Sequence, residues 1–287
     1  MTRVAIVGAA GIQGAQVAGR LEGRLDYELA LVETGAGEER LRERGLRPVA
    51  LADAARGATA VILAVPDGAI KSVAAEVAPA LDAGCLLVVL DAAAPFAAEL
   101  SPRADVPVFV AHPCHPSVFT THLTADGKRD FAGGVVPQDV VCCLASGDES
   151  AYAAGERLAR DMFSPVDRAF RVTLEQFVLL EPTLSETTAA TLLEVIKEAM
   201  DEAVARGVPA DVARAFLYGH IGIELAIIFG ELQAPFSVSA DYAIETARPR
   251  LVNPDWAAVF EPAKVREVAE AIADGALPSV RRHGVRA

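Results

Sequence analysis

The sequence predicts an α/β protein in which a doubly wound parallel sheet is followed by an all-helical C-terminal domain. Short, continuous apolar runs rich in Val, Leu and Ile alternate with helical patterns up to about residue 170, as expected of parallel strands covered on both faces. A glycine-spaced turn follows the first run, and beyond residue 174 the short runs give way to long helical patterns. We therefore expect two domains, residues 1–173 and residues 174–287.

The first domain is expected to alternate strands with helices. The expected strands are Val4–Val7, Leu29–Val32, Val49–Leu51, Ala60–Val65, Cys85–Leu90, Val106–Ala111, Val140–Leu144 and Arg168–Val172. The expected helices between them are Ala15–Gly23, Glu38–Gly45, Ala69–Leu81 and Ser150–Met162. Such alternation places ligands at the carboxyl ends of the strands.

The second domain is expected to hold three helices. Thr183–Arg206 has one long helical pattern that ends before Gly207, and Asp211–Leu232 has a second, strongly apolar pattern that indicates burial on most sides. The residues from Pro235 to Pro254 are rich in Ser, Thr, Asn and Pro, so we expect them to interrupt the helices. The third helix is expected at Glu261–Ala273.

The turn after the first strand has the spacing G-x-x-G-x-x-G, formed by Gly8, Gly11 and Gly14. A strand, a glycine turn and a helix in this order bring backbone N–H groups and a helix N-terminus against a pyrophosphate. Ile12 and Gln13 lie at the expected start of that helix. The context predicts a Rossmann-type dinucleotide-binding domain, with a tight turn that binds no ligand as the alternative.

Glu33 follows the second expected strand, nineteen residues after Gly14. A carboxylate at this place accepts hydrogen bonds from an adenosine ribose 2′-hydroxyl and repels a 2′-phosphate. The sequence therefore predicts NAD as the cofactor rather than NADP.

Two further strand ends supply candidate cofactor contacts. Val65 and Pro66 end one strand, and because proline cannot continue a ladder, this end is expected to line the cofactor crevice. Asp67 then either caps the next helix or lies near the nicotinamide ribose. Asp91 follows the next strand and is either a loop cap or a cofactor contact.

His112 and His115 are spaced i, i+3 at the end of a later strand, and each precedes a proline. Prolines fix the backbone so that imidazoles can be aimed, and histidine serves as a base or a metal ligand near neutral pH. A rigid structural turn is the alternative. His122, close behind in a polar loop, is expected to be solvated.

Four ionisable residues stand out in the helical part. Glu181 follows an apolar run and precedes a proline, so it does not resemble an ordinary surface charge. Glu186 is placed with the histidines as a catalytic candidate, and a helix cap is its alternative. His220 and Glu224 are spaced i, i+4 on the most apolar helix, where they either satisfy each other or belong to the site.

Composition limits the choice of partners. The net charge of −13 argues against nucleic-acid binding and against attraction to an anionic membrane surface. No apolar run approaches the length of a membrane span, and the four cysteines form no C-x-x-C pair. We expect a cytoplasmic protein that acts on a small molecule, with the apolar helices forming a homodimer.

Together these residues resemble the superfamily of 6-phosphogluconate and β-hydroxyacid dehydrogenases and ketol-acid reductoisomerases. The shared features are the glycine loop, the Ala-Val-Pro-Asp strand end at residues 64–67, and the long helix that ends in Ala-Arg-Gly-Val at residues 205–208. The whole chain more closely resembles the phosphogluconate-dehydrogenase-like group that includes D-apionate oxidoisomerase. The segments that carry this resemblance are Ala-His-Pro-Cys-His-Pro-Ser-Val-Phe at 111–119 and Leu-Glu-Pro-Thr-Leu-Ser-Glu-Thr at 180–187.

The resemblance implies that NAD oxidises a hydroxyl of a sugar acid, with a metal-assisted rearrangement of the carbon skeleton. β-Hydroxyacid dehydrogenases use a lysine with a nearby asparagine on the long helix, whereas this chain has only Lys197 there, so His115 or His112 is the expected base. The paired carboxylates that hold two magnesium ions in ketol-acid reductoisomerases are missing. One zinc, manganese or iron ion on His115 and Glu181, with His220 as a third candidate, is expected instead.

Two other functions remain open. The first is a metal-free NAD-dependent hydroxyacid dehydrogenase with a histidine base. The second is a non-catalytic NAD-sensing dimer, against which the ionisable groups at the carboxyl end of the sheet argue.

Overall fold

The computed structural model describes residues 1–98, 100, 103–119, 127 and 130–275. These residues form two compact units, one made of Met1–Glu181 with the described residues from Val265 onward, and one made of Pro182–Lys264. The expected boundary after residue 173 differs from this division. The reason is that helices α7 (Leu174–Val178) and α11 (Pro262–Ala273) bury apolar side chains in the core of the first unit.

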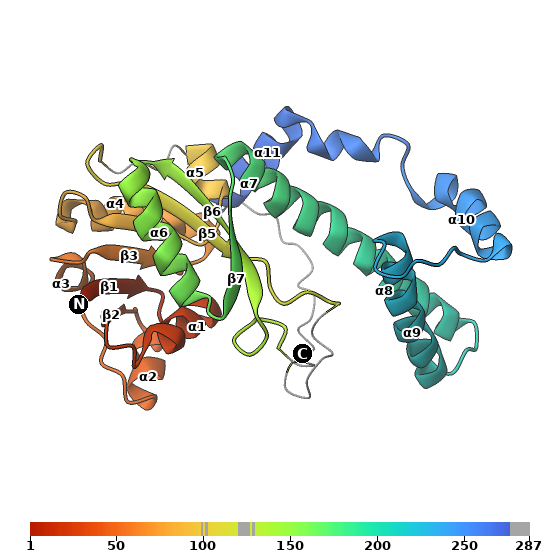
Figure 1. Cartoon of the computed structure of the whole chain (residues 1–287), viewed down its shortest axis with the longest axis horizontal. Coiled ribbons are helices and arrows are strands. Elements are labelled where there is room, and N and C mark those ends of the chain that lie inside the picture. The colour runs from red at the N-terminus through yellow and green to blue at the C-terminus, as the bar shows by residue number, and fades with distance from the viewer. Residues whose placement is uncertain (99, 101–102, 120–126, 128–129, 276–287) are drawn as a thin grey trace. The chain divides into compact units, whose positions relative to one another are not determined.

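The first unit is built on a seven-stranded sheet with the order β2-β1-β3-β4-β5-β6-β7 (Figure 1). The strands are β1 (Thr2–Val7), β2 (Tyr27–Val32), β3 (Ala60–Leu63), β4 (Leu86–Val89), β5 (Val108–Pro113), β6 (Gln138–Ser146) and β7 (Val166–Arg171). The first five strands of the chain pair in parallel, which confirms the predicted sheet over that part.

The last two strands correct the prediction of a wholly parallel sheet. β6 runs antiparallel to β5, and β7 runs parallel to β6. Parallel neighbours need a crossover connection, usually a helix, whereas antiparallel neighbours need none. The described residues between Pro113 and Gln138 contain no α-helix, which fits the antiparallel return.

Alternate residues of β1 face two hydrophobic cores, so the sheet is covered on both sides. Val4 and Ile6 join the core formed with α1 (Ile12–Leu21), α2 (Ala36–Glu43) and α6 (Glu149–Met162). Ala5 and Val7 join the core formed with α3 (Leu51–Ala55), α4 (Asp67–Val77), α5 (Ala93–Ala98), α7 and α11. The doubly wound class is confirmed.

The expected strand Val49–Leu51 is wrong. Only Pro48 makes an isolated bridge, to Leu31, and Leu51 is already the first residue of α3. Three apolar residues are too few to distinguish a strand from the start of a helix.

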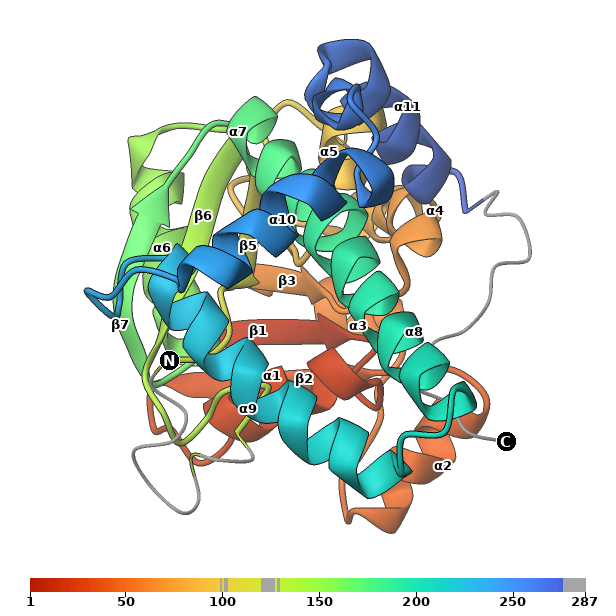
Figure 2. The same cartoon turned by 90° about the vertical axis from the view of Figure 1, so that its right-hand side faces the viewer.

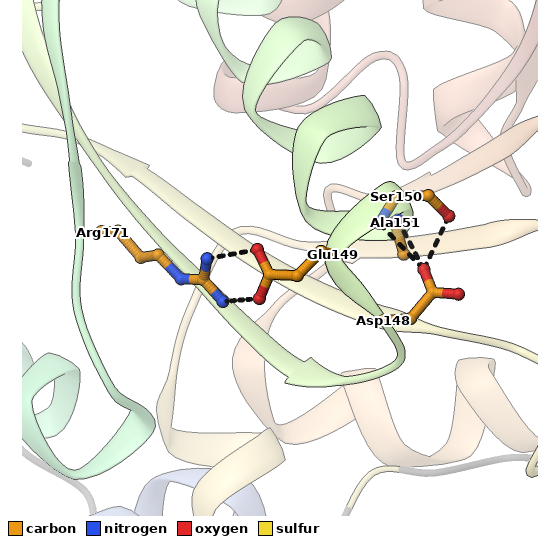
Figure 3. Close-up of polar contacts among 5 residues, drawn as sticks. All are labelled: Asp148, Glu149, Ser150, Ala151 and Arg171. Carbon is orange, nitrogen blue, oxygen red and sulfur yellow. Dashed lines mark hydrogen bonds and ion pairs between the residues drawn. The ribbon is translucent and has the colours of Figure 1, made fainter.

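The antiparallel end of the sheet is fastened to α6 by polar contacts (Figure 3). The Asp148 carboxylate caps α6 by accepting hydrogen bonds from the backbone N–H groups of Ser150 and Ala151, at 3.0 and 3.1 Å. Arg171 of β7 donates two hydrogen bonds to the Glu149 carboxylate, at 2.7 and 2.6 Å. This bidentate pair joins the edge strand to the helix behind it.

The second unit is helical, as expected. A π-helical segment (Leu179–Ala190) contains a break at Glu181 (φ −138°, ψ 123°), after which the chain continues into α8 (Thr191–Ala205). α9 (Ala210–Ile228) follows and contacts α8 (Figure 2). The expected interruption from Pro235 to Pro254 is wrong, since it holds α10 (Val238–Leu251). Ser237 caps α10 through Ala240 N–H, and Pro249 lies in its last turn.

Among the described residues, no helix combines the length and the apolar character that crossing a membrane requires.

Candidate active site

The glycine turn has the close packing that a dinucleotide loop requires. A Cβ on Gly8 would lie 2.2 Å from the carbonyl oxygen of Ala64, and Gly8 has a φ of 85°, so only glycine fits there. A Cβ on Gly14 would lie 2.1 Å from the carbonyl oxygen of Gly8. The turn therefore brings α1 close against β1, as the predicted loop requires.

The N-terminus of α1 is free to receive an anion. Gly11 is its N-cap, no side chain caps it, and its first turn holds no acidic residue. Ile12 and Gln13, the first two helical residues, are exposed. Unpaired N–H groups and the positive end of the helix dipole at this point suit a pyrophosphate.

Glu33 stands at the end of β2 and reaches back to the glycine turn. Its Oε1 accepts a hydrogen bond from Ala10 N–H at 2.6 Å. Ala10 occupies the place of the usual middle glycine, so this bond links the expected ribose-binding carboxylate to the expected phosphate loop. Gly37 makes room for it, because a Cβ there would lie 2.3 Å from Glu33 Oε2.

A pocket of about 780 Å³ lies beside this turn. It is lined by five of the expected cofactor residues, Gly8, Gly11, Glu33, Val65 and Pro66. The residues that hold NAD remain a prediction, but the pocket, the free helix N-terminus and the carboxylate all suit that cofactor.

Asp67 and Asp91 lie at the same edge of the sheet. Asp67 opens α4, and partial burial and the charge of Glu181 raise its pKa above the ordinary value. Asp91 caps α5, because its Oδ1 accepts from Ala93 N–H at 2.7 Å. Burial, followed by the charge of Asp67, raises the pKa of Asp91 to about 7. The structure thus gives Asp91 the cap role that the sequence left open; its contact with the cofactor remains a prediction.

His112 lies near the end of β5 and is held in a defined orientation. Its Nδ1 lies 2.8 Å from the carbonyl oxygen of Leu90, which can only accept, so Nδ1 carries the proton. The same nitrogen lies 3.0 Å from Glu181 Oε2. That oxygen is buried and has no aligned hydrogen-bond partner among the described residues. Nε2 of His112 is therefore the nitrogen left for a ligand.

His115 adopts a left-handed backbone conformation, with a φ of 60°, which is uncommon for a residue that is not glycine. Its ring meets the ring of His112 edge to face, with the centroids 5.9 Å apart. The Ala132 carbonyl lies beside this ring and acts on it as a hydrogen-bond acceptor. A neutral imidazole always keeps one nitrogen that can accept a proton. Backbone strain of this kind concentrates at functional sites.

The two imidazoles are pushed toward opposite charge states. Burial alone would lower the pKa of His112, but its contact with the Glu181 carboxylate outweighs burial and raises it. Burial and the charge of His112 lower the pKa of His115. A pair whose pKa values are driven apart can supply one acid and one base at neutral pH.

The other site candidates belong to the second unit or fall outside the described residues. Glu186 and His220 belong to the second unit, and both are exposed. Nδ1 of His220 lies 2.9 Å from the Phe216 carbonyl oxygen, and its ring stacks on Phe216. Lys197 is exposed and pairs with Asp201. His122 lies outside the described residues.

The expected metal donor set is not assembled in the described part of the chain. The carboxylate of Glu181 contacts His112 rather than His115, and no group of three His, Cys, Asp or Glu side chains there is arranged to hold an ion.

Arg20 is the residue near the histidines that sequence analysis missed. It donates to the carbonyl of Gly133 at 2.6 Å, across a separation of 113 residues. Its place in the last turn of α1 resembles an ordinary helix C-terminal charge, so no local signal marks it.

Two family models match the chain. The acetohydroxy acid isomeroreductase NADPH-binding domain matches residues 1–141, and the C-terminal domain of decarboxylating phosphogluconate dehydrogenase matches residues 120–273. A D-apionate oxidoisomerase from Rhizobium rhizogenes is 46% identical over 268 residues, covering 92% of this chain and 97% of that protein. One from Cupriavidus necator is 44% identical with the same coverage. The chain belongs to the D-apionate oxidoisomerase family.

A solved structure matches nearly the whole chain. It is described as a semialdehyde dehydrogenase NAD-binding protein from Cupriavidus necator in complex with calcium and NAD. It is 43% identical, matches with a TM-score of 0.90, and covers 95% of this chain and 99% of that one. The resemblance found in the histidine–proline segment is confirmed, and so, at the level of the family, is an NAD-dependent oxidoreductase.

Proposed function

We propose that the protein is an NAD-dependent oxidoisomerase that oxidises a hydroxyl of a sugar acid and then rearranges its carbon skeleton. The observation that carries this is the pair of oriented imidazoles, His112 and His115, at the carboxyl end of β5. The names of the relatives, at 44–46% identity, and the NAD bound to the Cupriavidus protein support it. D-apionate is the first substrate to test.

His115 serves as the base in this proposal. Its lowered pKa keeps the ring neutral, and a neutral imidazole keeps one nitrogen free to take the hydroxyl proton. NAD, when bound, accepts the hydride from the carbon that carries this hydroxyl. The helix N-terminus at Gly11, the turn at Gly8 and the carboxylate of Glu33 are the groups that would hold it.

His112 serves as the donor. With Nδ1–H on Leu90 and the carboxylate of Glu181 beside it, a protonated ring offers Nε2–H to a substrate oxygen. In an α-ketol shift, one hydroxyl loses its proton and becomes a carbonyl while a carbon–carbon bond moves to the neighbouring carbonyl carbon. The oxygen on that carbon then takes up a proton, and His112 is suited to supply it.

A metal-assisted shift is the second candidate, because a divalent ion polarises carbonyl and hydroxyl oxygens. The calcium in the Cupriavidus structure supports testing it. The unassembled donor set described above does not support the expected zinc, manganese or iron on His115, Glu181 and His220.

One assay tests the function. The purified protein is incubated with NAD and a panel of sugar acids that includes D-apionate, before and after exhaustive dialysis against EDTA. Absorbance of the reduced cofactor measures oxidation, and NMR of the product carbon skeleton measures rearrangement. Oxidation without rearrangement indicates the simple hydroxyacid dehydrogenase. Loss of activity after EDTA indicates the metal-assisted shift. If no acid reduces NAD, the protein is the non-catalytic NAD-sensing dimer.

Glu33 is expected to determine the cofactor preference. Replacing Glu33 with alanine should raise KM for NAD by about 10- to 100-fold, since a hydrogen bond to a charged group contributes about 1.5–3 kcal/mol. The preference for NAD over NADP should narrow at the same time. Glu28→Ala, on the exposed part of the same strand, is the control and should leave both values unchanged. Unaltered KM for both cofactors in Glu33→Ala would remove this role.

We also propose a homodimer formed through the helical unit. The helix predicted at Asp211–Leu232 was expected to be buried. Instead, Ile223 and Ile228 of α9 and Phe229 just after it expose 50%, 64% and 68% of their surface in the single chain. Exposed apolar side chains of this kind indicate a surface that a partner covers. A second copy of the chain is suited to cover it, because a two-fold dimer brings the same apolar surface of both copies together. Light scattering at micromolar concentration should give twice the 30.0 kDa chain mass; a 30.0 kDa particle would contradict the dimer.

The cysteines support a cytoplasmic location. All four are free, and three of them, Cys85, Cys142 and Cys143, are buried. Burial raises the pKa of Cys85 and of Cys142 to about 12, which keeps these thiols protonated and unreactive. Unpaired buried thiols are typical of a reducing compartment.

A further inference from the structure

Arg20 connects the last turn of α1 to the segment that leads into β6. Its Nη2 donates to the carbonyl of Gly133 at 2.6 Å and lies 3.4 Å from the carbonyl of Ala132. Its Nη1 lies 3.5 Å from the carbonyl of Met162, at the end of α6. The guanidinium is half-buried and has carbonyl oxygens as its partners, so it fixes backbone rather than a mobile side chain.

The segment that Arg20 contacts has a defined conformation. Asp130 accepts hydrogen bonds from the backbone N–H groups of Val135 and Val136, at 2.9 and 2.8 Å, which closes residues 130–136 into a loop. Gly134, at its tip, has a φ of 127°, and a Cβ there would lie 3.3 Å from the Arg20 guanidinium. The loop and the guanidinium are thus packed closely together.

The same loop lies beside the ring of His115. The carbonyl of Ala132 acts on this ring as a hydrogen-bond acceptor and raises its pKa, and Arg20 lies within hydrogen-bonding distance of that same carbonyl. His115 sits on a left-handed backbone that its neighbours must stabilise. The orientation of the imidazole therefore depends on where the backbone of Ala132 and Gly133 lies.

We propose that Arg20 is a positioning residue for His115. By holding the Ala132 and Gly133 carbonyls on α1, Arg20 fixes the acceptor that orients the imidazole, and it couples the proposed cofactor-binding helix to the proposed base. This inference rests on the proposed role of His115. A purely structural role for Arg20 would change stability without changing turnover of the folded enzyme.

The experiment compares Arg20→Ala, Arg20→Lys and the control Arg160→Ala. Arg160 lies on α6 and also bonds a side chain and a backbone carbonyl, those of Glu156 and Asp167, neither of which belongs to this loop. The readouts are kcat and KM with D-apionate or the best acid of the panel, the dissociation constant for NAD by calorimetry, and the melting temperature.

Arg20→Ala should lower kcat by about 10- to 100-fold, since displacement of a reacting group by about 1 Å can cost about 100-fold. NAD affinity should stay within about twofold, Arg20→Lys should recover part of kcat, and Arg160→Ala should match the native enzyme. A kcat within about twofold of native for folded Arg20→Ala would overturn the proposal. If Arg20→Ala does not fold, Arg20→Gln, which is shorter and uncharged but keeps one donor group, takes its place under the same criteria.

A double variant separates this inference from the proposed function. If Arg20 acts through His115, adding Arg20→Ala to His115→Asn should cost less than about a further twofold in kcat, because contributions of coupled residues are not additive. A full further loss would show that Arg20 acts independently and overturn the inference. Native turnover in His115→Asn would instead refute the base, whereas a collapse there with normal Arg20→Ala would refute only the positioning role.

Discussion

Replacing His115 by asparagine should lower turnover by about 100- to 10,000-fold, the contribution typical of a positioned general base. Asparagine is chosen because it tolerates the left-handed backbone at a φ of 60°. A loss of turnover then results from the missing imidazole and not from a change in backbone conformation. NAD affinity should stay near native, since the pocket residues around Gly8 and Glu33 are unchanged. Steady-state kinetics and calorimetry with NAD measure the two effects.

The control is Cys114→Ser, one residue earlier, whose exposed thiol has no part in the proposed chemistry. It should keep native turnover and melting temperature. If His115→Asn turns over at the native rate, the base lies elsewhere. If both variants lose activity and stability alike, the turn is a structural element, which was the alternative that the sequence left open.

The pH dependence of kcat/KM should follow the same pair of rings. Burial and the charges of His112 and Arg20 lower the pKa of His115, so the rate should rise on an acid limb below pH 6.5 as this ring loses its proton. The Glu181 contact, acting against burial, raises the pKa of His112, so the rate should fall on an alkaline limb above pH 6.5. The limbs belong to the coupled pair, and His112→Gln should abolish the alkaline one.

The features that sequence analysis predicted well are encoded within a few consecutive residues. The glycine turn, the acid at the end of β2 and the apolar runs of the first five strands each depend on local spacing. The kink at Glu181 was not predicted, although it too has a local signal, because proline at 182 disfavours a helical conformation in the preceding residue.

The features that were missed depend on partners far along the chain. The antiparallel direction of β6 is decided by its pairing with β5, which no local pattern records. Glu181 was assigned to a metal with His115, yet it contacts His112 across 69 positions of sequence. Arg20 was not singled out, because its contacts lie 112 to 142 residues away. Where chemistry depends on such contacts, spacing identifies candidate residues and the fold decides which of them meet.

Asp91→Asn should stabilise the protein, and the gain should grow with pH. Burial and the charge of Asp67 raise the pKa of Asp91 from 3.8 to about 7, so the folded state holds a proton that the unfolded state releases. Ionisation therefore disfavours folding as pH rises between these two values, and the penalty levels off above about pH 7. Three pKa units correspond to about 4 kcal/mol, which sharing of charge among neighbouring carboxylates reduces to about 2–4 kcal/mol.

Asparagine keeps the cap, since its Oδ1 can still accept from Ala93 N–H, so the comparison isolates the charge. Urea unfolding without NAD should show a small advantage for the variant near pH 4.5 and a much larger one at pH 8. Asp105→Asn is the opposite control: the hydrogen bond from Arg103 lowers the pKa of Asp105, so removing this charge should weaken the protein at neutral pH. An advantage of Asp91→Asn that is the same at every pH would mean that the buried carboxyl does not titrate in this range. In that case the negative charges of Asp67 and Glu181 would not raise the pKa of Asp91 as described above.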